Sequence, residues 1–107
     1  MVYFLTVTEL ANARVTNEQI ERLYHRYYWA EEFCRDKDVL EVACGNGQAL
    51  GLLAKTARSL KAGDYSPVLV DACRKQYGTR VDISQFDAQS VPYPERSFDV
   101  ILIFEAF

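Results

Sequence analysis

The chain has 107 residues, of which 50% are hydrophobic, so it is long enough for one globular domain with a sizeable core and short for an enzyme. Its formal net charge is -3, and its isoelectric point lies near 5.1. The basic residues occur singly or in short groups rather than as a patch, which disfavours a nucleic-acid-binding protein.

The cysteine and histidine content disfavours a metal site or a disulfide framework. The three cysteines are widely spaced without a CxxC pair, and the chain has one histidine, His25. The first ten residues lack the basic region of a signal peptide, and no apolar stretch approaches the roughly 20 residues that cross a bilayer. We therefore expect a cytoplasmic protein that binds neither metal nor membrane.

The first predicted element is a helix that follows a leading segment, residues 1–15, of little periodicity. Thr16 and Gln19 form a capping-box pattern, which predicts a helix from Thr16 to about Cys34. Together the leading segment and this helix occupy residues 1–35. A short polar connector leads from there into the next element.

Short apolar runs then alternate with helical patterns. Pro67 suits the first position of a helix and Gly78 ends it, whereas residues 90–97 predict a loop. The predicted strands are residues 39–44, 60–64, 81–86 and 98–104, and the predicted helices are residues 48–58 and 67–77. This order predicts an α/β domain with a parallel sheet and right-handed crossovers.

The carboxyl ends of these strands carry the candidate functional residues, because ligands of open α/β sheets bind there. A nucleoside-like ligand needs exposed backbone without a Cβ, which Gly45 and Gly47 offer, and a carboxylate for its ribose hydroxyls. Asp64 offers that carboxylate, and an isolated acid after a short apolar strand has little structural purpose. A dinucleotide site with the pattern GxGxxG is disfavoured, because the third glycine, Gly51, comes one residue too late.

Four stretches resemble the motifs of the class I S-adenosylmethionine-dependent methyltransferases. VLEVACGNG, from residue 39, is similar to the first motif, and AGDYSP, from residue 62, is similar to the second. FDAQSVPYPERSFDVILIFEAF, from residue 86, resembles the third and fourth. The resemblance covers residues 39–107, and the helix with LYHRYYWAEEF resembles the leading helix of many members.

The resemblance implies an α/β, Rossmann-like parallel sheet of about four strands in the order 3-2-1-4, flanked by helices, with S-adenosylmethionine as cofactor. It identifies no catalytic residue. The cofactor-binding residues that it implies are Glu41, Ala43, Gly45 and Gly47 around the methionine part, Asp64 at the ribose, Tyr65 against the adenine, Asp87 and Ala88 at the adenine edge, and Glu105 beside the sulfonium. Ala43 departs from the family, in which many members have glycine.

The predicted function is methyl transfer from S-adenosylmethionine to a small-molecule acceptor that the sequence does not identify. Methyl transfer from a sulfonium is an in-line displacement, so orientation supplies much of the acceleration and no nucleophilic side chain is needed. One alternative is a cofactor-binding or interaction module without transferase activity. Another is an NAD-dependent oxidoreductase.

Each single residue also has a structural interpretation. Glu41 can cap a helix, and Asp87 is a common turn former. We expect Cys44 to be a small buried residue rather than a reactive thiol. We expect His25 to be a helix-surface or packed histidine rather than a catalytic base. We expect Arg26 to be exposed on the same helix. Tyr24, Tyr27 and Tyr28 favour packing in the core or a lid.

The position of the last residue, Phe107, directly after the most apolar strand, predicts a fragment. Members of the family that the chain resembles continue with further α/β units, so we expect residues 1–107 to form one S-adenosylmethionine-binding domain that lacks its C-terminal part. In that sheet order the strand 98–104 has an open apolar edge, and open edges recruit other chains. The expectation is pairing with a second copy at that edge.

Overall fold

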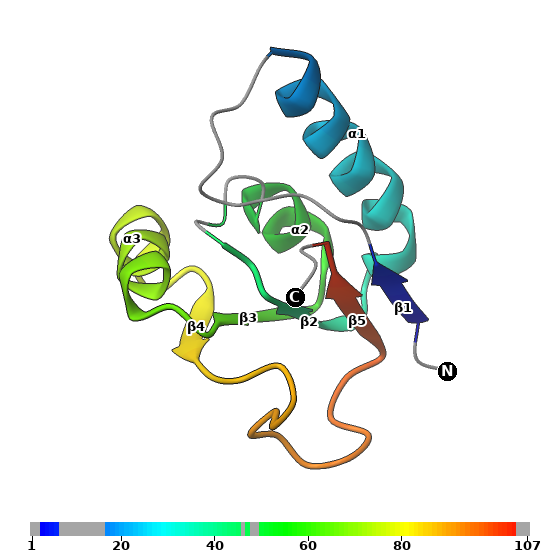
Figure 1. Ribbon diagram of the computed structural model, residues 1–107. Helices are drawn as coiled ribbons and strands as arrows, with labels where there is room; N and C mark the ends of the chain where they lie inside the picture. The colour runs from blue at the N-terminus through cyan, green and yellow to red at the C-terminus, as the bar shows by residue number, and fades with distance from the viewer. Residues whose placement is uncertain (1–2, 7–16, 46, 48–49, 105–107) are drawn as a thin grey trace.

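Five parallel strands form the sheet at the centre of the computed structural model, which describes residues 3–6, 17–45, 47 and 50–104 (Figure 1). The order across the sheet is β1-β5-β2-β3-β4. The strands are β1 (Tyr3–Thr6), β2 (Asp38–Val42), β3 (Ser59–Asp64), β4 (Asp82–Gln85) and β5 (Val100–Ile103). The helices are α1 (Asn17–Cys34), α2 (Leu50–Thr56) and α3 (Pro67–Tyr77).

The four predicted strands are confirmed, and so is their order, because β4, β3, β2 and β5 lie side by side as 3-2-1-4. Helix α1 ends at Cys34 as predicted, and the strand ends differ from the predictions by one or two residues. Thr16 and residues 48–49, which the predicted helices include, lie outside the described residues.

Strand β1 is the element that the sequence did not predict, and it corrects the expectation of an open edge. Its residues pair in parallel with β5, from Tyr3 beside Val100 to Thr6 beside Ile103. The backbone groups on that side of β5 therefore already have partners within the chain. The prediction that strand 98–104 offers a free edge to a second copy was wrong.

Side chains on the sheet alternate between two apolar layers. Val39 and Leu102 point to the face that the helices cover, whereas Leu40 and Ile101 belong to the cluster on the other face. In Figure 1 the three helices lie on one side of the sheet and the loop between β4 and β5 runs along the other. Parallel strands are normally covered on both faces, and here a loop covers one of them.

Helix α3 begins and ends at the residues that the sequence indicated. The Ser66 hydroxyl accepts a hydrogen bond of 3.3 Å from the Leu69 amide, and Pro67 follows at the first helical position. At the other end the Gly78 amide donates to the Arg74 carbonyl, with Gly78 at a φ of 57°. These caps fix where α3 starts relative to the end of β3.

An ionic cluster joins the strands at their amino ends. Arg58 pairs with Asp38 at 2.7 Å and with Asp99 at 3.4 Å, and the Ser59 hydroxyl donates to Asp38. Hydrogen bonds from Arg58 and Ser59 lower the pKa of Asp38 to about 2. The cluster ties β2, β3 and the approach to β5 together at the edge opposite the candidate site.

Gly63 in β3 occupies a position with no room for a side chain. A Cβ added there would lie 1.9 Å from a ring carbon of Phe86, which is buried and stands edge-on to Tyr93 at 6.0 Å. Gly51 in α2 has ordinary space, because its nearest neighbour would be Tyr77 at 3.7 Å.

We therefore expect Gly63→Ala to destabilise the fold by about 1–3 kcal/mol, because the Phe86 ring must leave its packed position. Gly51→Ala is the matched control and should be neutral or stabilising by up to about 1 kcal/mol, since alanine favours a helix. Urea unfolding of both variants measures the difference. Equal stabilities of the two variants would show that Phe86 does not pack on Gly63 as described.

Candidate functional site

The candidate site lies where β2 and β3 end beside each other. The Cys44 amide donates a hydrogen bond of 2.9 Å to the Gly63 carbonyl, so the glycine segment that leaves β2 stays next to the end of β3. The Phe86 amide donates to the Asp64 carbonyl at 3.1 Å, which places the end of β4 beside β3 in the same way. Three strand ends thus meet at one edge, as the sequence predicted from the parallel order.

Asp64 connects the glycine segment to α3. One carboxylate oxygen accepts a hydrogen bond of 2.9 Å from the Gly45 amide, and the other accepts one of 2.9 Å from the Ser66 amide. The sequence assigned no structural purpose to this acid, and that judgement was wrong. Asp64 holds two backbone segments in place, and its own orientation is fixed in return.

The backbone between β2 and α2 turns through left-handed conformations. Ala43, Gly45 and Gly47 have φ values of 57°, 61° and 70°. Ala43 therefore adopts a conformation that glycine takes more readily. This gives a physical reason why many members of the family that the sequence resembles have glycine at this position. At Gly47 a Cβ would lie 2.8 Å from the Cys73 sulfur, so packing beneath the segment also requires glycine there.

Residues of α3 support the glycine segment from below. The Cys73 thiol donates to the Gly45 carbonyl at 3.1 Å, and the Tyr77 hydroxyl donates to the Gly47 carbonyl. Cys44 is buried, as predicted, 4.0 Å from the Cys73 sulfur. The hydrogen bond with Cys73, together with burial, raises the pKa of the Cys44 thiol, which favours an inert residue.

Glu41 lies inside β2 with 1% of its surface exposed, on the face that the helices cover. The Tyr27 hydroxyl of α1 donates a hydrogen bond to its Oε1 atom. Glu41 does not cap a helix through that contact, since its partner is a side chain. Tyr27 is 4% exposed, which confirms its prediction as a packed residue.

The remaining predicted residues lie around the same edge with different surroundings. Tyr65 is 71% exposed directly after β3. Asp87 is exposed, and its Oδ1 atom accepts a hydrogen bond of 2.9 Å from the Gln89 amide, the contact expected of a turn former. Ala88 is half-buried on the loop face of the sheet. Glu105 lies outside the described residues.

The sequence identified some residues of α1 correctly and others not. His25 is exposed, as predicted for a helix surface, but Arg26 is half-buried rather than exposed. Tyr24 and Tyr28 are 37% and 58% exposed, so they are not core residues. The contacts of Tyr27, Cys73 and Tyr77 with the site were missed. Tyr27 and Cys73 recur with other apolar residues at helical spacing, and that spacing does not indicate which strand or loop they contact.

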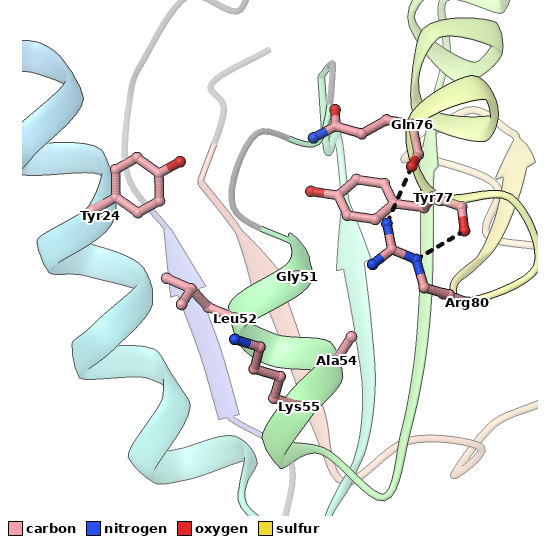
Figure 2. Close-up of a pocket in the computed structure, with 8 residues that line it drawn as sticks. All are labelled: Tyr24, Gly51, Leu52, Ala54, Lys55, Gln76, Tyr77 and Arg80. Carbon is pink, nitrogen blue, oxygen red and sulfur yellow. Dashed lines mark hydrogen bonds between the residues drawn. The ribbon is translucent and has the colours of Figure 1, made fainter.

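One groove is lined by none of the predicted cofactor-binding residues at the strand ends. It has a volume of about 640 Å³ and lies between α1 and α3 over α2, where Tyr24 and Tyr77 face each other (Figure 2). Its lining residues are Tyr24, Gly51, Leu52, Ala54, Lys55, Gln76, Tyr77 and Arg80. A second cavity, of about 400 Å³, lies on the loop face and includes Ala88. Of the predicted cofactor-binding residues, Ala88 alone lines either of these two cavities.

Metal clusters and membrane-spanning helices are both absent from the described residues. Within the described ranges, no three or more His, Cys, Asp or Glu side chains gather where they could hold a metal ion. The helices of the same ranges include none with the length and apolar character that spanning a membrane requires.

The strand order and the glycine segment define an α/β protein of the Rossmann-like class. The sequence profile of the methyltransferase-domain family matches residues 39–107. The chain therefore belongs to that family, within the class I S-adenosylmethionine-dependent methyltransferases.

Curated relatives carry related names. A probable S-adenosylmethionine-dependent methyltransferase of Mycobacterium tuberculosis is 38% identical over 72 residues, which are 67% of this chain and 26% of that protein. A fatty-acid O-methyltransferase of Mycolicibacterium smegmatis is 31% identical over 100 residues, which are 91% of this chain and 36% of that protein. The chain thus spans about a quarter to a third of the length of these relatives.

Solved structures agree in fold. The [4+2]-cyclase SpnF matches 89% of this chain and 37% of its own with a TM-score of 0.65 and 26% identity. The PH0226 protein of Pyrococcus horikoshii matches 88% of this chain and 44% of its own with a TM-score of 0.66 and 23% identity. These likenesses support the arrangement of strands and helices described above.

The bond between Tyr77 and Gly47 generates a prediction for the site. Tyr77→Phe removes one hydroxyl and leaves the Gly47 carbonyl without that donor, so the free energy of unfolding should fall by about 1 kcal/mol. Tyr28→Phe removes a hydroxyl from the exposed face of α1 and should leave stability unchanged. Urea unfolding measures both, and an unchanged Tyr77→Phe protein would contradict this support of the glycine segment.

Proposed function

We propose that the chain carries the cofactor-binding part of a methyltransferase that transfers a methyl group from S-adenosylmethionine to a small molecule. The observation that carries the proposal is the Asp64 carboxylate, held at the end of β3 by the amides of Gly45 and Ser66. It lies beside a glycine segment and an exposed aromatic ring, the combination that a nucleoside requires.

The hydrogen-bond acceptors of Asp64 fit the ribose of the cofactor. A carboxylate has about four lone-pair sites, and the hydrogen bonds from the Gly45 and Ser66 amides use two of those of Asp64. Acceptor capacity remains on both oxygens for two neighbouring ribose hydroxyls. Because the backbone bonds fix the carboxylate, binding the ribose would cost little reorganisation.

The other predicted residues are proposed to surround the rest of the cofactor. Glu41, Ala43, Gly45 and Gly47 would face the methionine part, where the turned backbone of the glycine segment permits close approach. Tyr65, with its exposed ring, would stack against the adenine. The residues proposed at the adenine edge are Asp87 and Ala88, and the residue proposed beside the sulfonium is Glu105.

The chemistry expected at this site is orientation of a reactive cation. When bound, S-adenosylmethionine supplies an electrophilic methyl group on a sulfonium. The acids at the strand ends complement its positive charge, and the fixed glycine segment orients it toward an acceptor. Cys44 is buried with a raised pKa and is not a candidate nucleophile.

The acceptor class rests on the relatives' names. One relative is a fatty-acid O-methyltransferase, and another is a probable phthiotriol/phenolphthiotriol dimycocerosates methyltransferase. Both names describe lipid acceptors rather than a protein or a nucleic acid, so a small molecule of lipid character is the acceptor that we propose. We also propose that the protein is located in the reducing environment of the cytoplasm.

Calorimetric titration with S-adenosylmethionine tests the proposal. The chain should bind it, and Asp64→Ala should weaken binding by roughly 10- to 100-fold, since bonds to a charged group are lost. Asp71→Ala changes the same charge on the exposed side of α3 and is the matched control.

Asp64 also holds backbone amides, so the unfolding midpoint of each variant must be measured beside its affinity. Binding of NAD in place of S-adenosylmethionine would contradict the proposal and favour an oxidoreductase. Methyl transfer to a fatty acid by the chain that binds S-adenosylmethionine would favour the enzyme over a cofactor-binding module.

A further inference from the structure

A buried tyrosine of α1 contacts the buried acid at the end of β2, and the proposed function does not use that tyrosine. The two side chains are Tyr27, which is 4% exposed, and Glu41, which is 1% exposed. We propose that Tyr27 is a positioning residue that holds the Glu41 carboxylate for cofactor binding, which makes α1 part of the site. The inference rests on the proposed function of the glycine segment and extends it to a helix.

The position of Glu41 in the sheet explains why its orientation needs support. It lies in the middle of the sheet, paired with Ala62 of β3 and Leu102 of β5. Its side chain shares the helix-covered face with Val39, because side chains alternate along a strand. A carboxylate in an apolar layer is costly unless hydrogen bonds satisfy it, so its donors decide where it points.

Tyr27 is a donor whose own position is fixed. Its ring packs against Phe104, directly after β5, with the ring centres 4.7 Å apart. About one and two turns further along, Ala30 and Cys34 are fully buried and anchor the helix in the core. The hydroxyl of Tyr27 therefore reaches Glu41 from an immobilised ring, and a hydrogen bond from it to Oε1 fixes the carboxylate orientation.

The pair of Tyr27 and Glu41 lies beside the segment that we propose for cofactor binding. Glu41 is the last residue but one of β2, two positions before Ala43, where the left-handed turn of the glycine segment begins. Phe104 follows the neighbouring strand at the same edge of the sheet. The Glu41 carboxyl group thus lies close in the chain to the segment proposed to surround the methionine part, whose ammonium and sulfonium are both cationic.

Two other tyrosines of α1 are suitable for a control that distinguishes the role of Tyr27 from a general effect of changing the helix. Tyr24 and Tyr28 are 37% and 58% exposed, and Tyr24 lines the groove of Figure 2. Removing the hydroxyl of Tyr28 changes the composition of α1 in the same way without touching Glu41. Tyr28→Phe is thus the control for Tyr27→Phe.

A double-mutant cycle on affinity for S-adenosylmethionine tests the inference. Tyr27→Phe should raise Kd roughly fivefold to tenfold, because a bond to a buried charged group is lost, and Tyr28→Phe should leave Kd unchanged. Glu41→Gln should also raise Kd. In the Glu41→Gln background, Tyr27→Phe should add less than about a twofold change, since both residues act through the same carboxylate.

The outcomes separate the two proposals. If the wild-type chain binds and Tyr27→Phe has the wild-type Kd, the inference is overturned and the proposed function stands. The same loss from Tyr27→Phe in both backgrounds also overturns it, because Tyr27 would then act without Glu41. No binding by the wild-type chain overturns the proposed function itself. Affinities are compared well below each unfolding midpoint, so that a purely structural loss appears in the midpoint and not in Kd.

Discussion

The candidate site depends on the Asp64 carboxylate more than on any other group. Its two oxygens accept hydrogen bonds from Gly45, at the turn after β2, and from Ser66, the cap of α3. The turn after β2, the end of β3 and the start of α3 are thereby fixed to one another at the carboxyl ends of the strands. The same interaction that stabilises the fold locally also orients the group that we propose for ribose binding.

The amino ends and the carboxyl ends of the parallel strands have different roles. At the amino edge, Arg58 with Asp38 and Asp99 forms a partly exposed ionic cluster whose groups bind one another. At the carboxyl ends of the strands, Glu41 accepts a hydrogen bond from a tyrosine hydroxyl, and Asp64 accepts hydrogen bonds from two backbone amides. Backbone amides are neutral donors, so the Asp64 carboxylate keeps its negative charge available to a ligand, which is the electrostatic basis of the proposed cofactor site.

Much of the fold was predictable because local signals agreed with it. Ser66, Pro67 and Gly78 mark the ends of α3 through their own chemistry, and the apolar runs fixed the strands. The order of the four strands came from resemblance to a family. Strand β1 was missed because Tyr3–Thr6 is short and its apolar residues are consecutive, so it gains its conformation from pairing with β5 rather than from its own pattern.

The site was predictable in its location and less so in its contacts. Parallel strands place Gly45 and Asp64 at one edge, which the sequence alone indicates. The hydrogen bonds of Asp64, the packing of Gly63 on Phe86 and the contact between Tyr27 and Glu41 join residues far apart in the chain. Such contacts depend on how α1 and the loop after β4 pack on the sheet, and no local pattern specifies that packing.

The measurement that tests the account most directly is an amide NMR titration with S-adenosylmethionine. The account predicts that the Gly45 and Ser66 amides, both bonded to Asp64, shift as the cofactor binds, while Ser59 at the opposite edge does not. Shifts confined to the groove between α1 and α3, at Lys55 and Arg80, would contradict it.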